Sequence, residues 1–434
     1  MTDPPRSKVR WILIFWIFVV SAIAYLDRVN VSIAGKAIAS EFHISNVQLG
    51  WIFSAFVLGY ALFQAPGGRL ADRIGPRNIL ALGVIWWGVF TTLITVLQAG
   101  TPVLLALLIG IRFSLGIGEA VVYPASNCVV ANWIPSQERG ISNGIIFAGV
   151  GFGAGLTPPL ITHLMVHYGW RSAFWASAVL GLVAGAIWYF LARDTPRQHP
   201  WVSESERKFI AAGLLATNEK HAGERLAWGS IFRNRDIMRV TFSYFCYGYA
   251  AYIFFSWFFI YLNDVRHLNL RQSTYYTMLP FIAMAIGSPL GGWLSDRLTK
   301  AYGKRAGRCG IAAFGIGLSA VFIALGTQVE SAQLASLILA GGAGALYLSQ
   351  SSFWSVSADI GGTSAGSVSG LMNMGGQIGG ALTASLTPAI ANRWGWSASF
   401  LVAAALCACG ALAWLIVEPE GRAVKNGITV ETPS

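Results

Sequence analysis

The amino-acid sequence predicts an all-α membrane protein whose twelve transmembrane helices form two pseudo-symmetric six-helix bundles. Three observations carry this prediction: the composition is too apolar for a protein in water, apolar segments recur along the chain, and two motifs repeat at nearly one offset. Of the 434 residues, 55% are hydrophobic and 11% are charged, whereas soluble domains carry about 25% charged residues. Such a chain needs hydrocarbon as its solvent.

The apolar segments have the length of spanning helices, which need roughly 20 residues each. They lack the alternation of β-barrel strands, since the run VLLALLIG at 103–110 is apolar throughout. The first segment is too long for the apolar core of a signal peptide, so we expect it to be retained. The predicted helices cover residues 11–33, 47–70, 79–98, 102–131, 140–166, 172–192, 238–262, 274–297, 309–327, 332–358, 364–391 and 396–417.

The basic residues are distributed unevenly between the two sides of the predicted membrane. Segments on the side of the N-terminus hold 23 of the 30 Lys and Arg, the opposite segments hold five, and two lie inside helices. Because cytoplasmic segments of membrane proteins are enriched in Lys and Arg, both termini are expected in the cytoplasm. Topology therefore accounts for the net charge of +11, and no nucleic-acid partner is expected.

A polar stretch from Arg193 to Asp236 divides six predicted helices from the other six. We expect three parts: an N-terminal six-helix bundle over 1–192, a cytoplasmic linker over 193–236 and a C-terminal six-helix bundle over 237–434. Within the linker, Ser203 and Glu206 have the spacing of a capping box, which predicts a short surface helix. A plain solvated linker is the alternative.

Two motifs of the first half return in the second half. GGRLADR begins at Gly67 and GGWLSDR at Gly291, while GWRSAF begins at Gly169 and GWSASF at Gly395. The offsets of 224 and 226 residues indicate a duplicated six-helix unit. In transporters built from such repeats the substrate site lies between the repeats, near the membrane midplane, and we expect it there in this chain.

Charged residues are rare inside the predicted helices. Those that fall well inside are Asp27 and Arg28 on the first helix and Arg112 and Glu119 on the fourth. Charges within a spanning helix are costly and usually functional. Arg112 and Glu119 are seven residues apart and share one helix face, about 10 Å apart along the axis, whereas Asp27 and Arg28 diverge by about 100°.

These four residues supply what a proton-coupled anion carrier requires. A carboxylate can change its protonation state when burial and a neighbouring arginine change with conformation. A guanidinium can hold a substrate carboxylate through two parallel hydrogen bonds. A structural ion-pair network that locks the first helix to the fourth is the alternative interpretation.

The segment GRLADRIGPR, from Gly68 to Arg77, resembles the loop signature of the major facilitator superfamily between helices 2 and 3. Only Asn78 departs from the form G-x3-D-[RK]-x-G-x-[RK]-[RK], and the second-half copy is more degenerate. An aspartate there can cap a helix N-terminus or pair with arginine, which would hold the cytoplasmic side closed. A topological charge cluster is the alternative. The residues expected at this cytoplasmic gate are Asp72, Arg73, Arg77, Asp296 and Arg297.

Two further segments, YLDRVN at 25–30 and RFSLGIGEAVVYP at 112–124, resemble the anion:cation symporter family within that superfamily. This family includes bacterial proton symporters for galactonate, hexuronates and glucarate, and animal sialin and vesicular glutamate transporters. The resemblance spans essentially the whole chain and implies the major facilitator fold.

The resemblance also implies roles by position. Arg28 would bind the substrate carboxylate, with Tyr25 and Tyr60 as cavity tyrosines of the same substrate-binding set. Asp27 and Glu119 would be the protonatable pair. Arg112 would partner Asp27 as the conformation changes.

The second half offers neutral polar residues instead of buried charges. The resemblance implies that Ser351, Trp354 and Asn373 face the cavity, where they suit a polyol chain. Their alternative role is interhelical hydrogen bonding, worth about 0.6 kcal/mol for each bond. Sugar-acid members carry a polar residue on the fifth helix, whereas residues 147–152 are apolar in this chain. That departure leaves room for a smaller or less hydroxylated anion.

Together these features predict a secondary active transporter that carries a small organic anion, a sugar acid such as a hexonate or hexuronate, in symport with protons by alternating access. The alternatives are a polyspecific proton-coupled exporter and a non-transporting membrane sensor. No metal-ligand set, phosphate-binding loop or nucleophile–base spacing indicates an enzyme. We expect no cofactor beyond the coupling proton, a monomer in the lipid bilayer, and a multi-pass location in a bacterial inner membrane.

Overall fold

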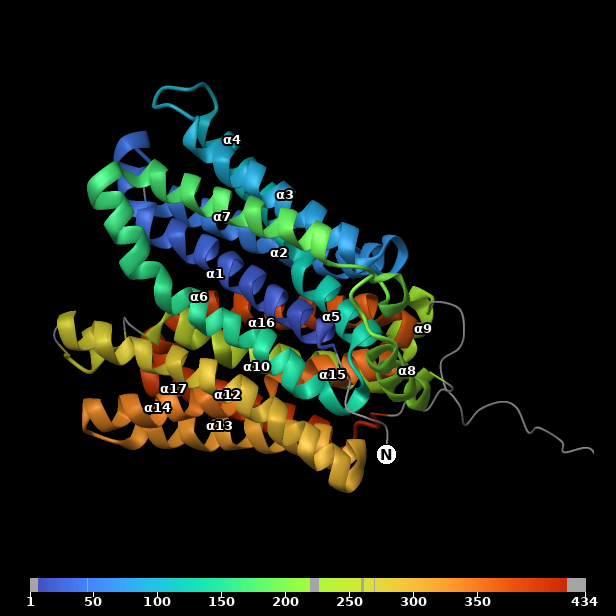
Figure 1. The fold of residues 1–434 in the computed structure, drawn as a ribbon. Helices are drawn as coiled ribbons and strands as arrows, with labels where there is room; N and C mark the ends of the chain where they lie inside the picture. The colour runs from blue at the N-terminus through green and yellow to red at the C-terminus, as the bar shows by residue number, and fades with distance from the viewer. Residues whose placement is uncertain (1–6, 45, 219–225, 259–260, 269, 420–434) are drawn as a thin grey trace, which may run out of the picture.

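The computed structural model describes residues 7–44, 46–218, 226–258, 261–268 and 270–419 (Figure 1). The first half of the chain forms one helical bundle and the second half forms another beside it, as predicted (Figure 1). Helices α8 and α9 of the connecting segment lie at one end of both bundles. We call this end the linker end.

The first bundle is built from long helices joined by short turns. Its helices are α1 (Val9–Phe42), α2 (Asn46–Ile74), α3 (Pro76–Thr95), α4 (Leu104–Ala120), α5 (Val122–Trp133), α6 (Arg139–Tyr168) and α7 (Trp170–Leu191), with the 3-10 turn η1 (Ser136–Glu138) between α5 and α6. The connecting segment contains η2 (Pro196–Gln198), α8 (Glu204–Asn218) and α9 (Trp228–Arg233).

The second bundle repeats this pattern. It contains α10 (Arg235–Ser256), η3 (Tyr261–Val265), α12 (Leu270–Lys304), η4 (Arg305–Gly310), α13 (Ile311–Gln328), α14 (Ala332–Leu348), α15 (Gln350–Gly361), η5 (Gly362–Ser364), α16 (Ala365–Trp394) and α17 (Trp396–Leu415). Eight segments of the described chain are long and apolar enough to cross a membrane, and some of them, such as 275–328 and 332–383, run through more than one helix. Each of the twelve predicted ranges is helical over most of its described residues.

The first predicted helix, 11–33, extends to Phe42, and the range 274–297 extends to Lys304. Three other predicted helices are interrupted or end early. The range 102–131 is interrupted at Val121, where Pro124 has no N–H to continue the helical ladder. The range 332–358 is interrupted at Ser349, whose hydroxyl and amide both donate to the carbonyl of Leu346. The range 238–262 ends as an α-helix at Ser256, because the backbone of Trp257 leaves the helical region at φ −121°.

The repeated motifs form matching turns. Gly169 lies between α6 and α7 at φ 80°, and Gly395 lies between α16 and α17 at φ 85°. Residues with a side chain rarely adopt this backbone conformation, so glycine is favoured at both sites. The sequence repeat is thus a structural repeat.

Glycines also bring the two bundles into close contact at the linker end. A Cβ on Gly68 of α2 would lie 1.9 Å from the carbonyl oxygen of Gly366 on α16. A Cβ on Gly292 of α12 would lie 2.2 Å from the carbonyl oxygen of Gly140 on α6. Small residues allow such close backbone approach between membrane helices, so α2–α16 and α6–α12 form the contact between bundles here.

The connecting segment is docked rather than freely solvated. The buried carboxylate of Glu206 on α8 accepts hydrogen bonds from Ser7 Oγ and from the backbone N–H groups of Val9 and Arg10 at the start of α1. Ser203 accepts the N–H of Glu206, as in the predicted capping box, but its own N–H donates to Ser7. The reciprocal half of the box is therefore not formed, because the Glu206 carboxylate is used to cap α1.

Candidate functional site

A small cavity lies between the two bundles, away from their ends. Its volume is about 40 Å³, far below the roughly 300–1,000 Å³ of pockets that hold drug-sized ligands. The bundles are thus nearly closed around it. The lining residues come from both halves and include Tyr25, Tyr60, Tyr123, Phe147, Tyr244, Tyr247, Tyr252, Phe255, Tyr347, Gln350, Asn373 and Gln377.

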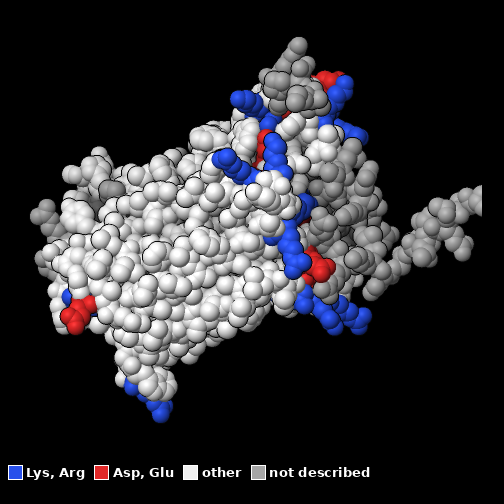
Figure 2. All heavy atoms as spheres, turned by 90° about the horizontal axis from the view of Figure 1, so that it is seen from below, with Lys and Arg blue, Asp and Glu red and all other residues white. Residues whose placement is uncertain are grey.

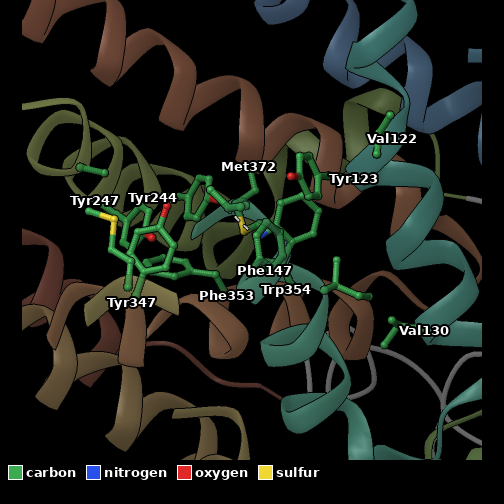
Figure 3. Packing of buried hydrophobic residues seen from close by; sticks show 14 of the residues in the cluster. Val122, Tyr123, Val130, Phe147, Tyr244, Tyr247, Tyr347, Phe353, Trp354 and Met372 are labelled. Carbon is green, nitrogen blue, oxygen red and sulfur yellow. Dashed lines mark hydrogen bonds between the residues drawn. The ribbon is translucent and has the colours of Figure 1, made fainter. Parts of the chain in front are cut away.

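Aromatic rings from both halves make up much of the cavity wall. Phe147 of α6 stacks on Tyr123 of α5, with ring centroids 4.9 Å apart, and also lies 4.9 Å from Trp354 of α15. Tyr244 and Tyr247 of α10 stack at 5.1 Å. Figure 3 shows these rings converging from the two bundles. Such a wall offers apolar faces and hydroxyl groups together, which is suited to a substrate with both kinds of surface.

The predicted carboxylate-binding arginine is paired inside the first bundle. Arg28 Nη2 on α1 lies 2.9 Å from Glu119 Oε2 on α4. The guanidinium also lies against the rings of Tyr25, Tyr60 and Phe56, at 4.8, 4.4 and 5.1 Å from their centroids. Tyr25 and Tyr60 line the cavity, whereas Arg28 is not among the lining residues. In this conformation the guanidinium therefore contacts the rings of two cavity-lining residues.

The other predicted pair, Asp27 and Arg112, is buried but not joined. Asp27 Oδ2 accepts a hydrogen bond from Thr91 Oγ1 on α3 at 2.9 Å, while its Oδ1 has no partner in the described part of the chain. Arg112 lies over the ring of Phe56 at 4.7 Å and forms no ion pair within the described residues. The role of Arg112 as a partner of Asp27 stays a prediction. Thr91 could not be predicted from the sequence, because its only signal is a hydroxyl in an apolar helix.

The second bundle contributes neutral groups. Asn373 of α16 lines the cavity and donates to Gln64 Oε1 of α2 at 2.8 Å, which links the two bundles. Gln350 Nε2 donates to the hydroxyl of Tyr244 at 3.1 Å, and its buried Oε1 has no partner among the described residues. The sequence identifies Gln350 as one of several polar residues of its helix, whereas Gln64 is not predicted, because a lone amide in an apolar helix does not reveal which way it faces.

The other two predicted cavity residues of the second bundle lie behind the wall. Trp354 is buried and its Nε1 donates to the hydroxyl of Tyr244 at 3.3 Å. Ser351 is also buried, and neither residue is among those that line the cavity. Their direct contact with substrate stays a prediction, and in this conformation Trp354 supports the wall through Tyr244.

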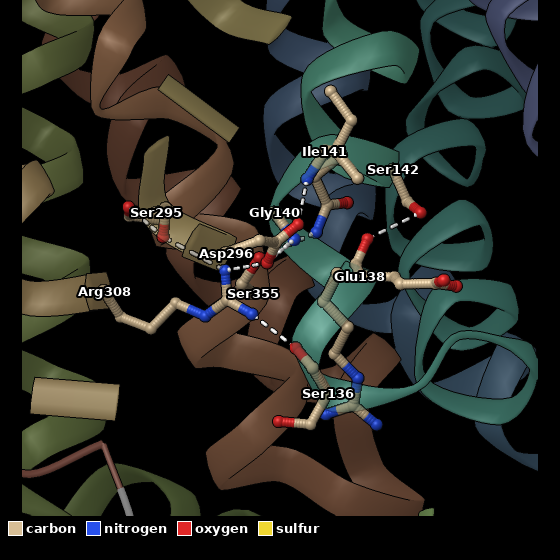
Figure 4. Close-up of polar contacts among 12 residues, drawn as sticks. Ser136, Glu138, Gly140, Ile141, Ser142, Ser295, Asp296, Arg308 and Ser355 are labelled. Atoms are coloured by element: carbon tan, nitrogen blue, oxygen red, sulfur yellow. Dashed lines mark hydrogen bonds and ion pairs between the residues drawn. The ribbon is translucent and has the colours of Figure 1, made fainter. Parts of the chain in front are cut away.

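The linker end is closed by two aspartates in equivalent positions. Asp72 of α2 accepts the N–H groups of Gly366 and Ser367 at 2.9 and 2.8 Å, which caps the start of α16 in the other bundle. Asp296 of α12 accepts the N–H groups of Gly140 and Ile141 at 2.8 and 2.6 Å, which caps the start of α6 (Figure 4). A carboxylate at a helix N-terminus satisfies free N–H groups and the helix dipole. Each bundle therefore caps a helix of the other.

Buried arginines complete this closure. Arg308 Nη1 lies 2.7 Å from Asp296 Oδ1, and its Nη2 donates to the carbonyl of Ser136 in the first bundle (Figure 4). Arg139 at the start of α6 pairs with Asp359 of α15, and Lys304 lies 3.4 Å from the same carboxylate. The sequence does not predict a place at the gate for Arg139, Lys304, Arg308 or Asp359, because their pairing depends on how the bundles meet.

The predicted gate arginines do not cross between the bundles in the described residues. The backbone N–H of Arg77 donates to Asp194 Oδ1 and its Nε donates to the carbonyl of Tyr189, both within the first half. Arg297 lies over the ring of Trp293 on its own helix. Arg73 is exposed beside a cleft of about 750 Å³ that also contains Asp72. In this conformation the aspartates, rather than these arginines, join the bundles.

Comparisons with known proteins agree with this architecture. Residues 17–384 match the family model of the Major Facilitator Superfamily. The chain is 34% identical over 431 residues to the probable sulfoacetate transporter SauU of Cupriavidus necator. The aligned region covers 99% of this chain and 96% of that protein. It is 31% identical over 399 residues to the probable galactarate/D-glucarate transporter GudP of Escherichia coli K12. The aligned region covers 87% of this chain and 86% of that protein.

A solved structure shares the fold. The proton:xylose symporter XylE, bound to 6-bromo-6-deoxy-D-glucose, superposes with a TM-score of 0.72 over 94% of this chain and 97% of that one, at 15% sequence identity. At this identity the match concerns the fold alone.

Proposed function

The chain belongs to the Major Facilitator Superfamily, as a membrane transporter and not an enzyme, and we propose that it carries a small organic anion in symport with protons by alternating access. The observation that carries this proposal is the buried Arg28–Glu119 ion pair beside the cavity. The fold supplies two bundles that can rock about the cavity, and the ion pair supplies the chemistry.

The ion pair suggests how the proton and the anion are coupled. A substrate carboxylate that reaches Arg28 competes with Glu119 for the guanidinium, which prefers a bidentate partner. A buried carboxylate that loses its cation is costly as a charge, so its displacement favours proton uptake. Asp27, held by Thr91 rather than by an arginine, is a second carboxylate for this purpose. No cofactor is required beyond the coupling proton.

We propose that the linker end faces the cytoplasm, so that this conformation is closed to the inside. Most of the Lys and Arg on the face shown in Figure 2 gather toward this end, and the broad middle of that face has none. Basic segments are retained in the cytoplasm. The termini would then be cytoplasmic, in a bacterial inner membrane, and the carrier would act as a monomer.

For the substrate we propose a sugar acid, such as a hexonate or hexuronate. Tyrosine hydroxyls and the amides of Gln350, Asn373 and Gln377 line the cavity, and these groups can hydrogen-bond a hydroxylated chain. The Oε1 of Gln350, which has no partner in the described ranges of the chain, can accept from a donor such as a substrate hydroxyl. The relative from Escherichia coli is named for two sugar diacids.

A compact anion such as sulfoacetate is the second candidate. It is favoured by the small cavity volume, by the apolar stretch 147–152 on α6 and by the name of the relative from Cupriavidus necator. A sugar acid has several hydroxyl groups and sulfoacetate has none. The polar residues with which the second bundle lines the cavity would therefore distinguish the two substrates.

A thermal-shift screen of the purified protein tests these assignments. The screen uses galactonate, glucuronate, galactarate, sulfoacetate, benzoate and the lipophilic cation tetraphenylphosphonium at two pH values. Uptake of the stabilising compound into proteoliposomes is then measured. We expect stabilisation by an anion and uptake driven by an inward proton gradient. Uptake that ignores the proton gradient would refute coupling, and stabilisation by lipophilic cations instead would support an exporter.

A further inference from the structure

A second hollow lies outside the transport pathway, on the second bundle at the linker end. It has a volume of about 720 Å³ and lies between α9, the start of α10 and the end of α17. We call it the α10–α17 groove. Its lining residues are Phe232, Arg233, Arg235, Met238, Arg239, Phe242, Cys409, Leu412, Ala413 and Ile416.

The floor of the α10–α17 groove is apolar, and no described part of the chain covers it. Phe242 of α10, Leu412 of α17 and Ile416 just beyond α17 are 48%, 62% and 54% exposed. On a bundle that spans a membrane, such a surface contacts acyl chains. A groove, unlike a convex helix face, can contact one acyl chain from several sides.

The mouth of the groove is basic. Arg233 and Arg235 are exposed and form no ion pair in the described part of the chain. Arg239 is partly neutralised, because its Nη1 lies 2.9 Å from Asp236 Oδ1 and also donates to the carbonyl of Ile416. The mouth therefore carries an excess of positive charge directly beside the apolar floor.

We propose that the α10–α17 groove binds an anionic phospholipid. The headgroup phosphate would lie between Arg233 and Arg235, within reach of Arg239, and one acyl chain would follow Phe242 and Leu412. Basic pockets at the ends of membrane helices select anionic headgroups. A soluble anion would leave the apolar floor uncovered, and a zwitterionic lipid would leave the excess charge unmatched.

The site would connect two parts of the fold. Arg233 belongs to α9 of the connecting segment, whereas Arg235 begins α10 and the floor includes α17. A headgroup held by both arginines would therefore hold the connecting segment against the second bundle. This proposal does not depend on the identity of the transported anion.

Native mass spectrometry of the full-length protein tests the proposal. The protein is incubated with equimolar phosphatidylglycerol and phosphatidylethanolamine, and retained lipid is compared for wild type, for Arg233→Gln with Arg235→Gln, and for Ala413→Phe, which fills the groove without a change of charge. The matched control is Arg193→Gln with Arg197→Gln, which removes two linker charges elsewhere. We expect selective retention of phosphatidylglycerol in wild type and control, and a several-fold loss in both groove variants. Equal losses in the control would show general surface attraction and overturn the site, as would retention unchanged by Ala413→Phe.

A thiol reaction gives a second measurement that needs no substitution. Cys409 lines the groove and is exposed, whereas the other four cysteines are buried. In nanodiscs, phosphatidylglycerol should slow the alkylation of Cys409 by N-ethylmaleimide several-fold relative to phosphatidylethanolamine alone. An unchanged rate would overturn the proposal even if the Ala413→Phe protein fails to fold.

Discussion

Arg28 Nη2 and Glu119 Oε2 lie 2.9 Å apart, and the guanidinium lies 4.8 and 4.4 Å from the ring centroids of Tyr25 and Tyr60. Arg28, which is predicted to bind the substrate carboxylate, is therefore paired in this conformation with Glu119, which is predicted to carry the proton. Anion binding and proton uptake would compete for one ion pair, and the first two predictions follow from this relationship.

Arg28→Ala should abolish binding of the transported anion. Truncating one member of a buried charge pair costs about 2–5 kcal/mol, which corresponds to a loss of roughly 30-fold or more in affinity. Arg28→Lys should restore little, because an ammonium lacks the planar fork of the guanidinium. Isothermal calorimetry measures both, with Arg171→Ala as the control because Arg171 pairs with Glu41 at a partly exposed site. Unchanged affinity in Arg28→Ala would remove Arg28 from the site.

Glu119→Gln should separate transport from proton coupling. The amide keeps the shape of the side chain but cannot exchange a proton in the transport cycle, so exchange of anion for anion should continue while uptake driven by a proton gradient is lost. Proteoliposomes loaded with unlabelled anion measure the first activity, and an imposed pH gradient measures the second. If gradient-driven uptake persists, Glu119 is not the coupling residue.

Asp72→Asn should open the linker end. The substitution weakens the cap on α16, whose two backbone hydrogen bonds to a charged acceptor are worth roughly 1.5–3 kcal/mol each. Buried Cys128, whose Sγ lies 3.2 Å from Asp72 Oδ1, should then be alkylated about tenfold faster or more. Asp194→Asn is the matched control, because Asp194 caps α3 within the first half. Equal acceleration in the control would indicate general loosening instead of gate opening.

Gln350→Leu should discriminate between hydroxylated and plain anions. Gln350 lines the cavity, and its Oε1 is an acceptor with no partner among the residues that the structure describes. Loss of a buried hydrogen bond costs about 1–3 kcal/mol. Affinity for gluconate should fall by about tenfold, while affinity for hexanoate should stay within about twofold. A parallel fall for both anions would mean that Gln350 only supports the cavity wall.

The connecting segment gives a prediction for pH. Burial would raise the pKa of Glu206, but hydrogen bonds from Ser7, Val9 and Arg10 outweigh it, so the pKa lies below its usual 4.5. A group with a lowered pKa contributes stability above its unfolded pKa and loses this contribution as pH falls through the folded value. The difference in Tm between wild type and Glu206→Gln should therefore be constant above pH 4.5 and shrink below it. Glu204→Gln should change little at any pH, because Glu204 and its partner Lys208 are exposed.

The buried charges show how far sequence reasoning reaches. Charge inside an apolar helix is rare enough to be identified from composition alone, and Asp27, Arg28, Arg112 and Glu119 are all buried or nearly so in the structure. Their pairing could not be read from spacing, because it depends on which helices pack together. In this conformation Thr91, from a third helix, donates to Asp27, and the pairing of Asp27 with Arg112 during a conformational change stays a prediction.

For Asp72 and Asp296 as well, the sequence predicts the positions, whereas the contacts depend on how the helices pack. The repeated motif located Asp72 and Asp296 and matched them, because a duplicated sequence keeps its local turns. Their partners are backbone N–H groups at the starts of α16 and α6, which no side-chain pattern reveals. Arg139 with Asp359 and Arg308 with Asp296 likewise join segments far apart in the chain.

The sequence by itself determined that the chain lies in a membrane, the number of spanning segments, their twofold repetition and the positions of the charged residues inside the helices. These properties follow from hydrophobic length, periodicity and the rarity of charge, all of which are local. Only the tertiary structure decided which charges are paired, which rings contact Arg28, and which buried polar atoms of the second bundle have no partner among the described residues. Those outcomes depend on contacts between helices, where a rotation of one helix by 100° exchanges a cavity residue for a buried one.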